Sequence, residues 1–107
     1  MKAYNIFTEA CSLAGETAPD ESLKKAGVGI INTILEDLNE NTVCSLSDEV
    51  EFSKTGEYTL LINGVAMLIC LYLGDDAGLS VMNELYSSAR KRLFGNIGSI
   101  KNTVFGR

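Results

Sequence analysis

The 107-residue sequence contains no histidine and no tryptophan. Without histidine it cannot form a Ser-His or Cys-His nucleophile pair, an imidazole metal site or the usual near-neutral general base. Carboxylates could take over such roles only if they converged in space. The two dense carboxylate groups, Asp75-Asp76 and Asp48-Glu49-x-Glu51, are instead expected to cap a helix and to lie in a solvated loop. We therefore predict that the protein is not an enzyme and that it holds no metal and no other cofactor.

Cysteine is scarce and widely spaced. The three cysteines, Cys11, Cys44 and Cys70, are odd in number and far apart, which excludes a complete disulfide framework and a Cys-x-x-Cys zinc site. Cys11 and Cys70 lie in apolar patterns, where a free cysteine behaves as a small hydrophobic residue. We expect buried free thiols and a reducing compartment.

Long hydrophobic runs are also missing. The longest apolar stretch, from Leu60 to Leu73, is interrupted by Asn63 and Gly64 and is shorter than the ~20 residues that span a bilayer. The N-terminal residues contain no continuous apolar stretch, so we expect neither a signal peptide nor contact with a membrane. Hydrophobic residues make up 46% of the chain and charged residues 21%, which is typical of a single globular domain.

Apolar residues recur at helical spacing along most of the chain, and the pattern predicts four helices. They are expected at residues 3–14, 18–39, 56–73 and 76–94. The third is apolar on almost every side, so it is either the central helix or a helix whose second face is covered by a neighbouring subunit. The predicted fold class is therefore all-α, a small bundle of about four helices that occupies residues 1–94.

Glycine and aspartate mark the expected ends of three helices. Gly15 ends the first helix and Gly74 ends the third, each as a left-handed stop. Asp75 or Asp76 then caps the fourth helix, which predicts a tight helix–turn–helix corner. The buried stripe expected on the fourth helix is formed by Val81 or Met82, Leu85, Tyr86, Ala89, Leu93 and Phe94.

The second helix has a cap signal at its start and two weak points inside it. Thr17 and Asp20 have the spacing of an N-terminal cap, and Pro19 suits a first helical turn. Gly27 and Gly29 each cost up to ~1 kcal/mol relative to alanine within a helix. We interpret them as places of close packing against another helix, with a hinge as the alternative.

Residues 39–55 lack helical periodicity and are expected to form a long loop. A loop of this length is unusual in so small a domain and is often functional or partly structured. Short extended pieces are expected at residues 42–44 and 50–52. Leu46, Val50 and Phe52 are the side chains expected to hold the loop on the core.

The net charge of −5 is unevenly distributed along the chain. Residues 1–89, with 4 basic and 14 acidic residues, carry −10, whereas residues 90–107, with 5 basic and no acidic residues, carry +5. Such polarity can drive head-to-tail contact between copies, or direct the C-terminal end to an acidic or nucleic-acid partner. Dipole compensation at the end of one helix, followed by a solvated tail, is the alternative explanation.

The C-terminal segment, residues 95–107, is not a plain polar linker. It spaces apolar and basic residues along its length, namely Ile97, Ile100, Lys101, Val104, Phe105 and Arg107. A short amphipathic segment of this kind either folds back on its own domain or docks into a partner, and both alternatives remain open.

Four segments of the chain carry a family resemblance. They are INTILEDLNE, which ends at residue 40, LSDEVEF at 46–52, the apolar YTLLINGVAMLICLYLG at 58–74 and DDAGLSVMNELYSSARKRL at 75–93. In the order of these elements the chain resembles the small all-α head–tail connector proteins of tailed phages, also called head-completion or adaptor proteins. The resemblance covers about residues 17–94 and lies in the pattern of elements rather than in one motif.

The resemblance implies assembly rather than catalysis. Connector subunits form a ring, commonly of twelve copies, beneath the portal protein of the filled capsid. The ring extends the channel for the genomic DNA without sequence-specific binding, and presents a surface to the tail or the next adaptor protein. The protein would then belong to the virion, at the head–tail junction, after synthesis in the host cytoplasm. By position, the segment 95–107 would dock into the portal.

Two groups of residues are candidates for contact between subunits of such a ring. Burial shared between the core and a neighbour is the hypothesis for Tyr58, Ile62, Ile69 and Tyr72. Contact with the acidic face of the next subunit, or with the portal, is the hypothesis for Arg90, Lys91 and Arg92.

Two other functions fit the sequence less well. The first alternative is a small cytosolic helical adaptor or regulator that binds one protein partner through its apolar surface and forms no ring. The second, nucleic-acid binding through the basic end, is disfavoured because the body is acidic and the basic residues lack interleaved aromatic residues for stacking.

Overall fold

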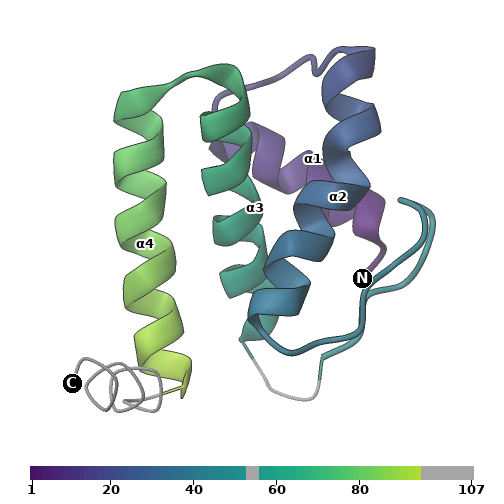
Figure 1. The fold of residues 1–107 in the computed structure, drawn as a ribbon, viewed down its shortest axis with the longest axis vertical. Helices are drawn as coiled ribbons and strands as arrows, with labels where there is room; N and C mark the ends of the chain where they lie inside the picture. The colour runs from purple at the N-terminus through teal and green to yellow at the C-terminus, as the bar shows by residue number, and fades with distance from the viewer. Residues whose placement is uncertain (53–55, 95–107) are drawn as a thin grey trace.

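A computed structural model of the chain describes residues 1–52 and 56–94. It contains four helices, α1 (Ala3–Leu13), α2 (Glu21–Asp37), α3 (Glu57–Leu73) and α4 (Asp76–Phe94). Within these two ranges there is no strand, and Lys2 and Glu49 form an isolated antiparallel bridge. The predicted all-α bundle of about four helices is confirmed (Figure 1).

The central element is α3, which packs against each of the other three helices (Figure 1). The helix α4 runs back alongside it, while α1 and α2 cover its other sides. Leu61, Val65, Ala66 and Ile69 of α3 are all completely buried. The apolar character on almost every side of this helix is therefore explained by three neighbours within the same chain.

The helix α2 begins later and ends earlier than predicted. Asp20 is its N-cap, with an extended backbone, and its carboxylate accepts a hydrogen bond of 2.8 Å from the Leu23 N–H. The prediction that Pro19 lies in the first turn, with Thr17 at the cap, is wrong. The Asp20 carboxylate accepts the hydrogen bond from the first turn, so the helix begins after Asp20 and Pro19 lies before it. At the other end Asn39 takes a left-handed conformation with a φ of 60°, which stops the helix.

The corner between α3 and α4 has the predicted construction. Gly74 ends α3 with a φ of 74°, and the Asp75 carboxylate caps α4 by accepting a hydrogen bond of 3.0 Å from the Gly78 N–H. A Cβ at Gly78 would collide with the Asp75 carboxylate and lie 3.0 Å from the Cys70 Sγ. Glycine at this position therefore lets the cap and the end of α3 approach each other.

Gly27 is a place of close packing, as interpreted from the sequence. A Cβ at Gly27 would lie 3.1 Å from the ring of Phe7, so α1 and α2 meet at this point. Gly29 differs, because no atom lies within 4 Å of the position of its Cβ. The close-packing interpretation is therefore confirmed for the first glycine and wrong for the second.

The loop after α2 is held by polar contacts as well as by apolar ones. The Asn32 side chain donates to the Val43 carbonyl at 2.9 Å and accepts from the Val43 N–H at 2.8 Å. One amide thus pairs with both backbone groups of Val43. Val50 is buried, and Leu46 and Phe52 are partly buried against the core, as predicted. The short extended pieces expected in this loop do not form strands within the described residues.

This loop also caps α1. The N-cap residue Lys2 makes no side-chain capping bond. Instead, the Ala3 and Tyr4 N–H groups donate to the carbonyls of Asp48 and Leu46, at 2.9 and 2.7 Å. The first N–H groups of a helix have no partner within it, so the loop supplies the acceptors that the sequence at the helix start lacks.

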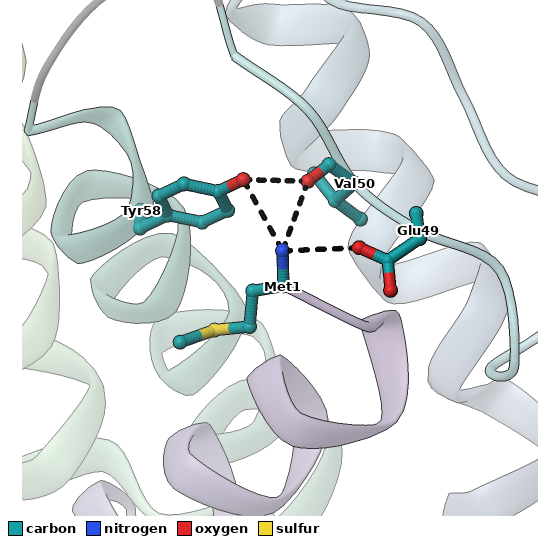
Figure 2. Close-up of polar contacts among 4 residues, drawn as sticks. All are labelled: Met1, Glu49, Val50 and Tyr58. Atoms are coloured by element: carbon teal, nitrogen blue, oxygen red, sulfur yellow. Dashed lines mark hydrogen bonds and ion pairs between the residues drawn. The ribbon is translucent and has the colours of Figure 1, made fainter.

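The N-terminal ammonium group ties α1, the loop and α3 together (Figure 2). It lies 3.3 Å from the Glu49 carboxylate, 3.4 Å from the Val50 carbonyl and 3.3 Å from the Tyr58 hydroxyl. Tyr58 also donates to the Val50 carbonyl at 2.7 Å, and its ring packs edge-on against Phe52. The start of α3 is thus anchored on the loop that caps α1.

Candidate assembly surface

Several large apolar side chains are exposed at the end of the molecule where α3 turns into α4. Leu71, Tyr72 and Leu73 are 58%, 48% and 43% exposed at the end of α3, and Val81 is 57% exposed near the start of α4. Exposed apolar side chains at one end of a molecule are candidates for an interaction site, and Leu13 and Val81 line the same hollow there. We call these four residues, with Leu13 at the end of α1, the corner surface.

An open groove lies beside the corner surface, where the end of α1 meets the start of α4. It has a volume of about 400 Å³. Its walls are apolar or small apart from one carboxylate, and the lining residues are Leu13, Ala14, Gly15, Cys70, Asp75, Ala77, Gly78, Val81 and Met82. We call this the corner groove. Two of the lining residues, at positions 15 and 78, are glycines and contribute no side chain to it.

One acidic side chain, that of Asp75, lines the corner groove. Two further acidic residues, Glu16 and Asp76, are next in the chain to lining residues. Burial, together with the nearby Asp75 carboxylate, raises the pKa of the Cys70 thiol. Cys70 therefore stays protonated at neutral pH and acts as part of an apolar wall rather than as a nucleophile.

The free cysteines divide into two kinds. Cys11 and Cys70 are free and buried, as predicted, whereas Cys44 is free and exposed on the loop. Burial, followed by the charge of Glu16, raises the pKa of Cys11 as well.

The basic end of α4 is partly engaged within its own chain. Arg90 Nε donates to Asp37 Oδ2 at 3.0 Å, and Arg90 Nη2 donates to the Asp37 carbonyl at 3.2 Å. The Tyr86 hydroxyl donates to the same carboxylate oxygen at 2.5 Å, and burial, with this bond, raises the pKa of Tyr86. Arg90 thus links α4 to the end of α2, whereas Lys91 and Arg92 are exposed.

The candidate interface residues of α3 are placed at different depths. Tyr72 is half exposed, Tyr58 and Ile62 are partly buried, and Ile69 is completely buried. Ile69 has no surface left for a neighbour, because α1, α2 and α4 surround α3; the hypothesis of shared burial is wrong for this residue. The candidate docking residues lie outside the described residues; they are Ile97, Ile100, Lys101, Val104, Phe105 and Arg107.

The sequence reasoning missed the groove and most of the corner surface. On α4 the buried stripe runs through Met82 and Tyr86, whereas Val81 and Leu85 are 57% and 46% exposed. The helix therefore has two apolar stripes, one for the core and one facing water. The sequence does contain a signal for the second stripe, in the adjacent apolar pairs at 81–82 and 85–86. Adjacent residues of a helix point in different directions, so one member of each pair must face away from the core.

No protein-family model, curated protein or solved structure matches this chain. Across residues 1–52 and 56–94, no three cysteine or carboxylate side chains come close enough together to hold a metal ion. None of the described helices combines the length and the apolar character needed to cross a membrane.

Proposed function

We propose that this protein is a structural assembly subunit, a head–tail connector of a tailed phage. In this role it forms a ring beneath the portal, extends the channel for the genomic DNA and presents a surface to the tail or the next adaptor. The proposal rests on the resemblance carried by the segments between residues 17 and 94 and on the surface described above.

The observation that carries the proposal is the corner surface. Leu71, Tyr72 and Val81 are each about half exposed, and five of the eight exposed large apolar side chains among the described residues belong to the corner surface. Burying the exposed half of one such side chain stabilises a complex by about half of the ~1.5–3 kcal/mol that full burial gives. A protein that leaves several of them in water at one end gains that free energy only when it associates.

The charge distribution supports a subunit that lies beside DNA without gripping it. All 14 acidic residues precede residue 85, and they give residues 1–89 a formal charge of −10. Such a body repels the phosphate backbone, so a duplex can slide past it. The basic residues gather from residue 90 onward, where they can meet an acidic protein partner.

The test is an imaging experiment on the full chain mixed with the portal protein of a phage that carries this gene. Negative-stain class averages are expected to show a ring added to one face of the portal. A chain carrying both Val104→Asp and Phe105→Asp is expected to leave the portal bare, because charge opposes docking of the apolar segment. Asn102→Asp is the matched control, because it adds a charge to the same segment without removing an apolar side chain.

Portals that remain bare with the unmodified protein would contradict the connector function. A small helical adaptor, the alternative function, would bind a single partner and give no ring. Solution mass without the portal does not separate the two functions, since connectors can stay monomeric until the portal is present.

A further inference from the structure

We propose that residues 95–107 of one copy dock in the corner groove of a second copy, so that subunits associate head to tail. The inference goes beyond the proposed function, because it concerns the protein alone and needs no portal. It rests on the position of the groove, on its charge and on the chemistry of the segment that follows α4.

The groove and the last described residue of the chain lie at opposite ends of α4. The groove is at the start of α4, and the described chain ends at Phe94, the last residue of that helix (Figure 1). With 19 residues at 1.5 Å each, α4 separates its two ends by ~28 Å. One copy therefore offers a receptor at one end and a ligand at the other.

The groove and the segment are complementary in chemistry. The groove has apolar walls, to which the exposed side chains of Leu13 and Val81 contribute, and one carboxylate, that of Asp75. The segment carries four apolar and two basic residues and no acidic residue. Apolar side chains of the segment would fill the groove while a cation of the segment faces the Asp75 carboxylate.

Charge favours a second copy over the same chain as the partner. Residues 95–107 span at most ~45 Å when extended, so the segment is long enough to reach back to its own groove. In that case Lys91 and Arg92 would remain ~23–26 Å along the helix axis from Asp75 and Asp76, far beyond the ~8 Å over which charges act at physiological salt. Docking between copies brings the basic end of α4 toward the acidic corner as well.

A contact of this kind has a consequence for assembly. Each docked pair leaves one groove and one segment unused, so association continues until the chain of subunits closes into a ring or extends as a filament. In a connector, the portal and the corner groove of the neighbour would compete for the same segment.

The test uses two single-residue variants of the full chain and their mixture. Val81→Asp places a charge at the edge of the groove, at a side chain that is 57% exposed, so the fold is retained. Phe105→Asp removes the largest apolar side chain of the segment. Each variant alone is expected to sediment as a monomer at concentrations where the unmodified protein forms larger species.

The equimolar mixture is the decisive sample. The intact segment of the Val81→Asp chain can dock in the intact groove of the Phe105→Asp chain, and no further subunit can add. The mixture is therefore expected to give a species of twice the 11.5 kDa of one chain, and nothing larger. Asn83→Asp and Asn102→Asp are the matched controls, which are expected to associate like the unmodified protein.

Three results would overturn the proposal. The unmodified protein could remain monomeric at every concentration, as it would if the segment occupied its own groove. The mixture could remain monomeric, which would exclude a groove-and-segment contact. A labelled peptide of residues 95–107 could bind the Phe105→Asp chain no better than it binds a chain carrying both substitutions. None of these results depends on the portal, so the proposed function is tested separately.

Discussion

Replacing Gly64 by alanine is expected to destabilise the protein, although this change usually stabilises a helix interior. A Cβ at Gly64 would lie 2.8 Å from Tyr86 Cε1 and 2.9 Å from Ile34 Cγ2. Both neighbours are buried, with exposures of 7% for Tyr86 and 3% for Ile34, so neither has free space to move into. Glycine is required in α3 because side chains of α2 and α4 meet over it.

Three effects set the magnitude of the change. Overpacking a filled site costs ~1–3 kcal/mol. Displacement of the Tyr86 ring also disturbs its 2.5 Å hydrogen bond to Asp37, a loss of ~1 kcal/mol. Alanine recovers ~1 kcal/mol relative to glycine through its helix propensity. The free energy of unfolding should therefore fall by ~1–3 kcal/mol.

The assay is urea unfolding followed by far-UV circular dichroism, with Gly29→Ala as the matched control. Gly29 also lies inside a helix, but it is exposed and has no atom within 4 Å of its Cβ position. The control is expected to gain up to ~1 kcal/mol, so the two glycine-to-alanine changes should have opposite signs. The m-value should stay the same in both, since neither change alters the surface exposed on unfolding.

A Gly64→Ala protein as stable as the unmodified one, with an unchanged m-value, would refute the reasoning. A double-mutant cycle with Tyr86→Phe examines the cause. If the added methyl group acts through the tyrosine and its bond to Asp37, the two changes should be coupled by ~0.5 kcal/mol or more.

Three further experiments, two substitutions and one chemical labelling, test other parts of the fold. Asn32→Ala removes both side-chain bonds to the Val43 backbone, so the free energy of unfolding should fall by ~1–3 kcal/mol in urea; no change would mean that the amide does not hold the loop. The Cys44 and Ser45 N–H groups donate to the Asp48 carboxylate and hold its pKa below the ordinary value of 3.8. The ionised carboxylate therefore stabilises the fold above pH ~3.8, and this stabilisation is lost as the pH falls through the lower pKa of the folded state. Asp48→Asn should therefore make the melting temperature less dependent on pH below about 4. A melting temperature that falls with pH as steeply as in the unmodified protein would contradict this role. Cys44 should react with a thiol reagent at neutral pH well before Cys11 or Cys70, because burial shields both thiols and raises the pKa of each; equal labelling by peptide mass spectrometry would contradict the burial.

The elements that the sequence predicted well depend on local chemistry. Gly74 and Asp75 form the corner between α3 and α4 with residues adjacent in the chain, so their signal is complete within a few positions. The start of α2 has two local signals, because Thr17 and Asp20 are both residue types that cap helices and only one can be the N-cap. Asp20 is the one that caps α2 in the structure. The capping of α1 by the carbonyls of Leu46 and Asp48 has no local signal, because the partners are more than 40 residues away.

Side-chain exposure was the least predictable property, because it depends on where neighbouring helices end. On α3, Ile69 and Leu71 are both strongly apolar, yet one is completely buried and the other is 58% exposed. The helix α1 ends at Leu13, beside the start of α4, and leaves the last turn of α3 uncovered. Periodicity within one helix carries no information about the length of its neighbour.

The polar contacts between α4 and α2 lie apart from the groove proposed for assembly. The bonds between α4 and α2 centre on Arg90 and Asp37, whereas the groove lies around Val81. Arg90 lies nine positions after Val81 in the helix, a distance of ~13 Å along the axis. Changes this far apart, without shared contacts, usually have additive effects on stability. A charge at Val81 should therefore abolish association without altering the free energy of unfolding, and a change at Gly64 should do the reverse, so assembly and folding can be measured as independent properties of one small chain.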